Sequence, residues 1–294
     1  MQKIYVIGAS GLIGDALYKN LKCKNYNVIG SYTKNIGPEL LKFDLCNPDF
    51  SIFKNIRQND VIYFMTAYSN PNWISENKDE TKLLNYTKTI EFINFFKRVQ
   101  PRFIFMSSVE IFDGNKGNYK EDDVANPLNY YGLLKSNIEN YLINNYPNYC
   151  IVRTGWNVGL NEKSRCVIQL TYETLLKPNA KMATDNFFSL AYVKDTAEGL
   201  ARISQNINLK KIHLCSSQIL GRQELADKII KYSKNGKNMK YSECIFNEIP
   251  YKEPRGRVND LVNTLSINEL KMKYEEVDSI IQKKVDYLDR KYDK

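Results

Sequence analysis

Short apolar runs alternate with longer segments of helical periodicity through the first two thirds of this 294-residue chain. Each run has the length and the Ile, Val, Phe and Tyr content of a strand that is buried on both faces. The runs span residues 3–7, 27–31, 61–65, 103–107 and 150–153. The alternation predicts an α/β fold of the Rossmann type, in which a doubly wound parallel sheet carries helices on both faces.

Two of the intervening segments place apolar residues at helical spacing. The first face consists of Leu12, Ala16, Leu17 and Leu21, and the second of Leu83, Leu84, Thr87, Ile90 and Phe95. Pro101 closes the second helix before the next strand begins. We expect these faces to pack on the sheet.

After Gly159 the alternation becomes less regular. The pattern predicts a helix over 195–203 with Asp195 as its N-cap, and a charged helix at the end of the chain. Further expected elements are strands over 211–215 and within YSECIF (241–246), and a helix over 222–232. The expected division is a Rossmann domain over 1–157 and a small C-terminal substrate-binding lobe over 158–294, with about 188–215 returning to the sheet domain.

A glycine turn, Gly8-Ala-Ser-Gly-Leu-Ile-Gly14, directly follows the first strand and opens the first helix. Gly8 permits the sharp exit from the strand, Gly11 lets the backbone approach a pyrophosphate, and Gly14 lets helix and strand pack closely. Free N–H groups at the helix N-terminus favour an anion. We expect the turn to hold a nicotinamide dinucleotide; the alternative is a structural turn that binds nothing. The expected contacts come from Gly8, Ser10, Gly11, Leu12, Ile13 and Gly14.

The second strand ends without an acidic residue, in the segment GSYTK (30–34). An acidic residue at this place binds the ribose 2'-hydroxyl and repels a 2'-phosphate. Ser31 and Lys34 would donate to that phosphate, so the segment predicts a preference for NADP(H) over NAD(H). The alternative for Lys34 is a solvated loop lysine.

Tyr131 and Lys135 stand four residues apart, on one face if the segment is helical. A free tyrosine has a pKa of about 10, and a nearby ammonium lowers that pKa and eases proton exchange at neutral pH. Ser108 follows the fourth strand, and a parallel sheet gathers ligands at the carboxyl ends of its strands. We expect Ser108 to hydrogen-bond the reacting oxygen, Tyr131 to exchange its proton, and Lys135 to tune Tyr131 and hold the nicotinamide ribose.

The spacing YxxxK occurs three times in the chain, also starting at Tyr18 and Tyr287. Tyr18 lies on the first helix behind the glycine turn, and Tyr287 lies in the charged tail. Tyr130 is a competing candidate, but its +4 residue is Leu134. The alternative interpretation of Tyr131 is a tyrosine packed on a core helix beside a surface lysine.

The formal net charge of the chain is +9 at pH 7, but Lys and Arg are interleaved with acidic residues. This spread favours an anionic small ligand over nucleic acid. No run of about 18 apolar residues exists to span a bilayer, and the first apolar run is too short for a signal peptide, so we expect a cytoplasmic protein. The six cysteines are scattered without a CxxC pair, which predicts reduced thiols and no metal site.

With these motifs in order, the chain resembles the extended short-chain dehydrogenases/reductases, and within them the dTDP-4-dehydrorhamnose reductase (RmlD-like) group. The likeness runs over nearly the whole chain. It rests on GASGLIG (8–14), TAYSN (66–70), SSVEIFDG (107–114), PLNYYGLLK (127–135) and VRTGW (152–156). The resemblance implies hydride transfer to the 4-keto group of a nucleotide-linked deoxysugar. It further implies cofactor contacts from Asp44, Leu45, Thr66, Ala67 and Tyr68, and sugar-nucleotide contacts from Ser108, Val109 and Trp156.

Some of these positions have a second interpretation. Trp156 also fits a large core aromatic at a domain junction. Arg255 and Arg257 would clamp a diphosphate bidentately, or form a solvated basic loop. Sugar-nucleotide 4,6-dehydratases place Asp-Glu after the catalytic hydroxyl, but this chain has Val109-Glu110, and valine cannot protonate a leaving hydroxyl.

Epimerase-reductases of the GDP-fucose synthase type use a Cys and a His, and here Val109 stands where that Cys would fall. The single histidine, His213, lies in a late strand and is expected to be structural. The sparse inventory suits simple NADPH-dependent reduction of a nucleoside-diphosphate 4-keto-6-deoxysugar, in the making of a cell-surface glycan. The alternatives are a 4-epimerase that retains NAD(P) and a non-catalytic binding subunit. The helices around 83–99 and 129–145 are also candidates for a homodimer contact.

Overall fold

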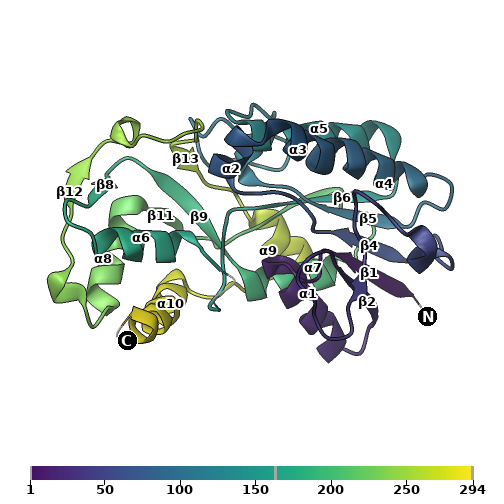
Figure 1. The fold of residues 1–294 in the computed structure, drawn as a ribbon, viewed down its shortest axis with the longest axis horizontal. Helices are drawn as coiled ribbons and strands as arrows, with labels where there is room; N and C mark the ends of the chain where they lie inside the picture. Colours follow the sequence, from purple (N-terminus) through teal and green to yellow (C-terminus); the bar gives the residue numbers. More distant parts are fainter. Residues whose placement is uncertain (1, 162–163, 293–294) are drawn as a thin grey trace.

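The computed structural model describes residues 2–161 and 164–292, and its centre is a seven-stranded parallel sheet (Figure 1). The strand order is β10-β6-β5-β4-β1-β2-β3. The strands are β1 (Lys3–Ile7), β2 (Asn27–Tyr32), β3 (Leu41–Lys42), β4 (Val61–Phe64), β5 (Arg102–Met106), β6 (Tyr149–Thr154) and β10 (Lys211–Leu214). The expected Rossmann architecture is confirmed, with the reversal of strand order beside β1 that creates a ligand crevice in such sheets.

Helices cover both faces of this sheet, as the alternation of buried side chains along each strand requires. One face carries α1 (Leu12–Cys23), α7 (Val193–Ile203) and α9 (Thr264–Leu270). The other carries α3 (Lys78–Lys82), the π-helical turn η2 (Leu83–Lys88), α4 (Thr89–Phe95) and α5 (Tyr130–Asn145). Along β1, Ile4 and Val6 pack in the first layer and Tyr5 and Ile7 in the second.

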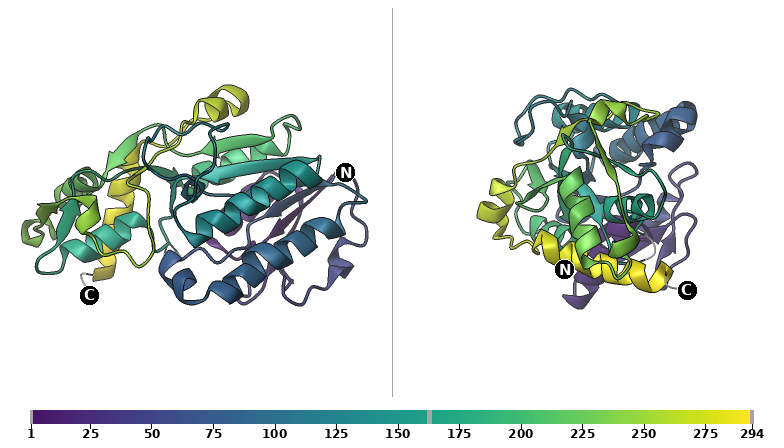
Figure 2. Two further views of the ribbon diagram at one scale, coloured as in Figure 1. Left: turned by 90° about the horizontal axis from the view of Figure 1, so that it is seen from above. Right: turned by 90° about the vertical axis from the view of Figure 1, so that its left-hand side faces the viewer.

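A smaller lobe lies beside the sheet domain (Figures 1 and 2). Its sheets contain β7 (Trp156–Val158), β9 (Phe187–Tyr192), β11 (Ile219–Gly221) and β13 (Val258–Asn259), and separately β8 (Lys181–Ala183) and β12 (Ser242–Cys244). Its helices are α6 (Val167–Leu175), α8 (Arg222–Tyr232) and α10 (Val277–Tyr292). The remaining short elements are α2 (Pro71–Glu76) and the 3-10 turns η1 (Phe50–Phe53), η3 (Val109–Ile111), η4 (Gly236–Asn238) and η5 (Phe246–Glu248).

The chain returns from the lobe to the sheet domain later than expected. β9 pairs with β7, β11 and β13 of the lobe, so the first return runs from α7 to β10 rather than over 188–215, and the chain returns a second time at α9. The expected N-cap is also wrong, because α7 begins at Val193. The carboxylate of Asp195 instead accepts a hydrogen bond from the backbone N–H of Glu275, at 2.9 Å.

The apolar face predicted for the second helix is right in part: Leu84 and Ile90 pack against the core, whereas Leu83 and Phe95 lie largely exposed. The π-helical turn η2 inserts an extra residue into the helical register, so the buried face rotates. Asn85, Thr89 and Phe92 are buried, whereas Leu83 and Phe95 are 44% and 48% exposed.

Among the described residues, no helix is both long enough and apolar enough to cross a membrane.

Candidate functional site

The glycine turn lies at the carboxyl end of β1 and has the geometry expected of it. Gly8 has a φ of +89°, and a Cβ there would lie 2.9 Å from the Thr66 hydroxyl. A Cβ on Gly14 would lie 2.2 Å from the carbonyl oxygen of Gly8, so only glycine lets α1 pack this close to β1. Gly11 is the N-cap residue of α1 and has no side chain with which to cap it. The first N–H groups of α1 therefore suit an anion.

A cavity of about 470 Å³ opens at this turn. Nine of the expected cofactor residues line it: Gly8, Ser10, Gly11, Lys34, Asp44, Leu45, Thr66, Ala67 and Tyr68. The volume is in the range of small-molecule and cofactor sites. Among the described residues, no cluster of His, Cys, Asp or Glu could hold a metal ion.

Six other residues expected to contact the cofactor do not line this cavity: Leu12, Ile13, Gly14, Ser31, Tyr131 and Lys135. Leu12 and Ile13 pack against the lobe's apolar core, and Gly14 is buried beneath the turn. Ser31 is only 2% exposed, and its hydroxyl accepts a hydrogen bond from the backbone N–H of Gly8 at 3.1 Å. Ser31 thus supports the glycine turn instead of facing a 2'-phosphate.

Sequence reasoning missed the contribution of the helix that follows β4. Glu80 and Leu84 line the cavity, and the Tyr68 hydroxyl donates to the Glu80 carboxylate at 2.7 Å, which raises the pKa of Tyr68 to about 12. The buried Asn85 side chain bonds both the N–H and the carbonyl of Tyr68, at 2.9 and 2.8 Å. The π-helical turn places Asn85 there, and no sequence motif signals it. The other cavity residues that were missed are neighbours of expected ones: Thr33, Asn35, Cys46 and Met65.

Ser108, Tyr131 and Lys135 come together beyond the end of β5. The Ser108 hydroxyl lies beside Tyr131, where it acts to lower the pKa of the phenol, and it accepts a hydrogen bond from the N–H of Glu110 at 3.2 Å. The Lys135 Nζ lies 5.8 Å from the centre of the Tyr131 ring and donates to the Met106 carbonyl at 2.7 Å. The three expected catalytic side chains therefore share one site.

Two residues at the start of α5 fix this arrangement. Asn129 caps the helix, and its side-chain oxygen accepts from the N–H of Gly132 at 2.9 Å. A Cβ on Gly132 would lie 2.0 Å from the carbonyl oxygen of Glu110, so glycine is required where α5 meets η3. Tyr131, between these two residues, is held against Ser108.

The electrostatics differ from the expectation that Lys135 lowers the pKa of Tyr131. Burial raises the pKa of the Tyr131 phenol, the nearby Glu110 carboxylate raises it further, and the Ser108 hydroxyl lowers it. Burial also lowers the pKa of Lys135 to about 7, against an opposing effect of Glu139. Burial and Glu110 thus dominate the pKa of the phenol, and Tyr131 holds its proton at neutral pH.

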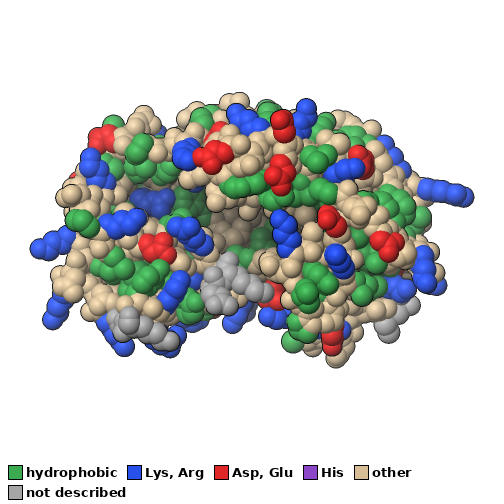
Figure 3. All heavy atoms as spheres, viewed as in Figure 1, with side chains coloured by type: hydrophobic (Ala, Val, Ile, Leu, Met, Phe, Trp, Pro, Cys, Tyr) green, Lys and Arg blue, Asp and Glu red, His purple; other side chains and the backbone are tan. Residues whose placement is uncertain are grey.

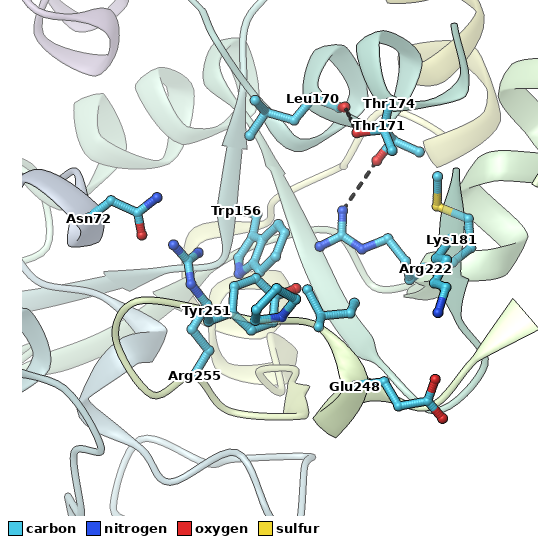
Figure 4. A pocket seen from close by; sticks show the side chains of 13 residues that line it. Asn72, Trp156, Leu170, Thr171, Thr174, Lys181, Arg222, Glu248, Tyr251 and Arg255 are labelled. Carbon is cyan, nitrogen blue, oxygen red and sulfur yellow. Dashed lines mark hydrogen bonds between the residues drawn. The ribbon is translucent and has the colours of Figure 1, made fainter. Parts of the chain in front are cut away.

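A second cavity, of about 380 Å³, lies between α2 of the sheet domain and the lobe (Figure 4). Trp156 stacks on Phe188 with ring centres 4.6 Å apart, and the Arg222 guanidinium covers both rings. Arg222 also donates to the Thr171 hydroxyl at 3.2 Å. Arg255 lies beside Trp156 and over the Tyr251 ring, so two guanidinium groups border the cavity.

Asn129 connects this cavity with the catalytic side chains. Its side-chain N–H₂ donates to the Glu110 carboxylate at 2.6 Å and to the Pro254 carbonyl at 3.2 Å. Arg255 follows Pro254 and acts electrostatically on Glu110. The surface is hollowed between the two parts of the molecule, with Lys and Arg side chains near the hollow (Figure 3).

Two residues expected to contact the substrate lie elsewhere. Val109 is 1% exposed and packs in an apolar cluster with Ile111 and Phe112. Arg257 is outside the lining of the lobe cavity and pairs with Asp185 at 3.6 Å, whereas Arg255 lines it. The Arg257 carbonyl accepts hydrogen bonds from the Phe187 N–H at 2.9 Å and the Asn186 side chain at 2.8 Å, which holds Arg257 beside Asp185.

Comparison with known proteins identifies a family and several relatives. A family model described as the RmlD substrate binding domain matches residues 1–288. Methionine adenosyltransferase 2 subunit beta of Xenopus tropicalis is 26% identical over 210 residues, which cover 69% of this chain and 62% of the relative. A dTDP-4-dehydrorhamnose reductase of Aggregatibacter actinomycetemcomitans is 28% identical over 167 residues, which cover 54% and 53%. The chain thus spans less than two thirds of the length of either relative.

Solved structures share the fold over almost the whole chain. A dTDP-4-dehydrorhamnose reductase from Clostridium acetobutylicum superposes with a TM-score of 0.82 and 22% identity, over 98% of this chain and 99% of that one. Another, from Bacillus anthracis in complex with NADP, gives a TM-score of 0.79 and 19% identity, over 96% and 98%. The family match covers both the sheet domain and the lobe, and the resemblance drawn from the motifs is confirmed. This chain belongs to the RmlD substrate binding domain family.

Proposed function

We propose that the protein is an NADPH-dependent ketoreductase that converts a nucleoside-diphosphate 4-keto-6-deoxysugar to its 4-hydroxy product. The observation that carries the proposal is the meeting of Ser108, Tyr131 and Lys135 at the end of β5. A cavity at the glycine turn and a cavity bordered by arginines lie in the same molecule. A retired active site would have no chemical need for all three side chains.

The residues at the glycine turn fit a nicotinamide dinucleotide. Gly8 and Gly11 leave room for the backbone to approach a pyrophosphate, and the N-terminus of α1 favours its charge. Lys34, exposed at the cavity edge, would pair with a 2'-phosphate. Lys135 would hold the nicotinamide ribose. The bound cofactor supplies the hydride, and every other contribution comes from the chain itself.

In the proposed reaction Tyr131 is the proton donor. Ser108 donates a hydrogen bond to the keto oxygen and positions it against the Tyr131 hydroxyl. As the C4 carbon gains the hydride, the C–O double bond opens and the oxygen takes the phenolic proton. The raised pKa of Tyr131 keeps that proton in place until charge develops on the oxygen.

The lobe cavity would hold the nucleoside diphosphate. Arg222 and Arg255 offer planar guanidinium groups that match phosphate oxygens. Trp156 and Tyr251 add aromatic surface at the same wall. We assign the diphosphate contacts to Arg222 and Arg255, in place of Arg257.

The decisive experiment is incubation of the protein with NADPH and a panel of dTDP-, GDP-, UDP- and CDP-linked 4-keto sugars. We expect stoichiometric loss of NADPH absorbance with at least one of them. Turnover without net NADPH oxidation would instead support the second candidate, a 4-epimerase. The relatives named as subunit beta of methionine adenosyltransferase 2 favour a third candidate, a non-catalytic binding subunit, and no turnover with any sugar would favour it.

Replacing Lys34 with Ala should raise the KM for NADPH about tenfold, because one charge-assisted contact to the 2'-phosphate is lost. The KM for NADH should stay unchanged. Lys54→Ala, an exposed lysine outside the cavity lining, is the matched control. Equal effects of Lys34→Ala on both cofactors would argue against a preference for NADPH.

Replacing Arg222 with Met should raise the KM for the sugar nucleotide by about 10- to 100-fold with little change in kcat, because it removes binding common to ground and transition states. Methionine keeps an unbranched chain against Trp156 and Phe188. Arg257→Met is the control, since its side chain lies outside the cavity lining. A larger effect at Arg257 than at Arg222 would overturn the assignment of the diphosphate contacts.

A further inference from the structure

A buried carboxylate lies on the catalytic helix, one turn beyond Lys135. Glu139 follows Lys135 by four residues and Tyr131 by eight, so all three project from one face of α5. Glu139 is 3% exposed and Lys135 is 6% exposed. Reduction of a ketone gives Glu139 no direct step, and it does not line either cavity described above.

Arg153 of β6 fixes the Glu139 side chain. Its Nε donates to one carboxylate oxygen at 3.1 Å and its Nη2 to the other at 2.7 Å. The third donor, Nη1, bonds the backbone carbonyl of Glu121 at 2.9 Å. Both carboxylate oxygens are therefore held in one orientation. Buried ion pairs contribute little net stability compared with well-packed apolar residues, so stability alone does not explain why Glu139 and Arg153 are charged.

The surroundings of the Lys135 Nζ are mostly apolar. Its Nζ donates to the Met106 carbonyl and lies 4.6 Å from the centre of the Phe105 ring, in an apolar setting that disfavours an ammonium. Burial accordingly lowers the pKa of Lys135 to about 7, and the Glu139 carboxylate acts to raise it. Burial therefore works against the ammonium form of Lys135, and the Glu139 carboxylate works in its favour.

The other ionisable groups packed around α5 act elsewhere. Glu110 acts on Tyr131, and Lys88 of η2 pairs with Glu91 at 2.7 Å. The nearby ring of His213 is neutral, because burial lowers its pKa to about 3. Arg153 faces the Glu139 carboxylate itself.

We propose that Glu139, oriented by Arg153, is a positioning residue that keeps the Lys135 side chain in its ammonium form beside Tyr131. The inference rests on the proposed function only through the contact of Lys135 with the nicotinamide ribose. As an ammonium, Lys135 has two N–H donors beyond the one that bonds Met106. As a neutral amine it has only one, and the attraction for a developing phenolate at Tyr131 is gone.

The test is the pH dependence of NADPH binding, which needs no sugar. A lysine loses its proton as pH rises, so the affinity of the wild type for NADPH should fall at alkaline pH; we call this fall the alkaline limb of the pH profile. Glu139→Gln removes the carboxylate that favours the ammonium, so the alkaline limb should move to lower pH by about one unit. NADPH fluorescence titrations from about pH 6 to about pH 9 would measure it. Lys135→Met should abolish the limb.

Glu139→Gln leaves Arg153 without its partner, so a second variant guards against misfolding. The double variant Glu139→Leu with Arg153→Met replaces the pair by apolar side chains and should fold, with the same shifted limb as Glu139→Gln. Glu139→Asp should restore part of the wild-type profile. The proposal would be overturned if Glu139→Gln and the double variant both kept the alkaline limb at its wild-type pH and bound NADPH equally more weakly at every pH. In that case the pair of Glu139 and Arg153 would have only a structural role.

Failure of this inference differs from failure of the proposed function. A protein that binds NADPH with the expected limbs but reduces no sugar keeps the role of Glu139 and loses the ketoreductase assignment. A protein that reduces a sugar with an unshifted limb in Glu139→Gln keeps the assignment and loses the role of Glu139. Absence of NADPH binding at every pH would overturn both.

Discussion

Tyr131→Phe should lower the turnover of the keto sugar by about 10³-fold while changing the Kd for NADPH less than about twofold. The substitution removes only the phenolic hydroxyl, and the ring keeps its place beside the Lys135 side chain. Without the phenolic proton, the oxygen that forms at C4 must take a proton from water. The rate of NADPH oxidation and the quenching of NADPH fluorescence measure the two quantities separately.

Tyr130→Phe is the matched control for this substitution. Tyr130 precedes Tyr131 on the same helix, and the Nζ atom nearest its ring centre, at 5.8 Å, is that of Lys78 rather than that of Lys135. The control variant should keep nearly full turnover. Appreciable activity in Tyr131→Phe, or an equal loss in the two variants, would remove Tyr131 from the role of proton donor.

The sheet and the glycine turn could be predicted because local residues determine them. The strands β1, β4 and β5 are short runs rich in Ile, Val, Phe and Tyr that are apolar on both sides, and such a run has few alternatives in an α/β chain. Gly8 and Gly14 stand where a positive φ and a close contact exclude any side chain, and the structure shows both constraints. The union of Ser108 with Tyr131 follows from the rule that strand ends converge.

The errors arise where tertiary packing decides. The π-helical turn rotates the face of the second helix, and nothing in the spacing of Leu83 or Phe95 announces it. Ser31 faces the N–H of Gly8 because β1 and β2 pair in parallel at that height, so the side chain closest to the expected phosphate is already engaged.

The choice between Arg255 and Arg257 depends in the same way on distant contacts. Arg255 and Arg257 flank Gly256 in the sequence, so their local sequence context is almost the same. Arg255 lies over the ring of Tyr251, and Arg257 pairs with the distant Asp185, which places only Arg255 at the lobe cavity. The pKa of Tyr131 is a similar case, since burial of the phenol cannot be read from the YxxxK spacing.

Burial of Tyr131 also bears on the stage at which the proton is transferred in the proposed reaction. A phenol whose pKa is raised gives up its proton only to a strong base, such as the alkoxide that forms when a ketone accepts hydride. The reverse reaction needs the phenolate, which burial and Glu110 disfavour and the Lys135 ammonium favours. The charge state of Lys135 therefore matters most for the return of Tyr131 to its starting form.

Gly14→Ala should weaken NADPH binding about 100-fold and lower Tm by about 5 °C, whereas Gly11→Ala should weaken binding about tenfold with Tm nearly unchanged. A Cβ added at Gly14 would lie 2.2 Å from the Gly8 carbonyl oxygen and 2.9 Å from the Cα of Ala9. Both neighbours are backbone, so α1 must move away from β1 and carry the anion-binding N–H groups with it. A Cβ added at Gly11 would meet only the Gly8 carbonyl oxygen, at 3.3 Å, and would extend instead toward the space expected for the pyrophosphate.

Thermal unfolding and NADPH titration of the two variants distinguish a turn displaced by packing, in Gly14→Ala, from a turn blocked at its surface, in Gly11→Ala. Unimpaired NADPH binding by Gly14→Ala would mean that the phosphates rest somewhere other than this loop.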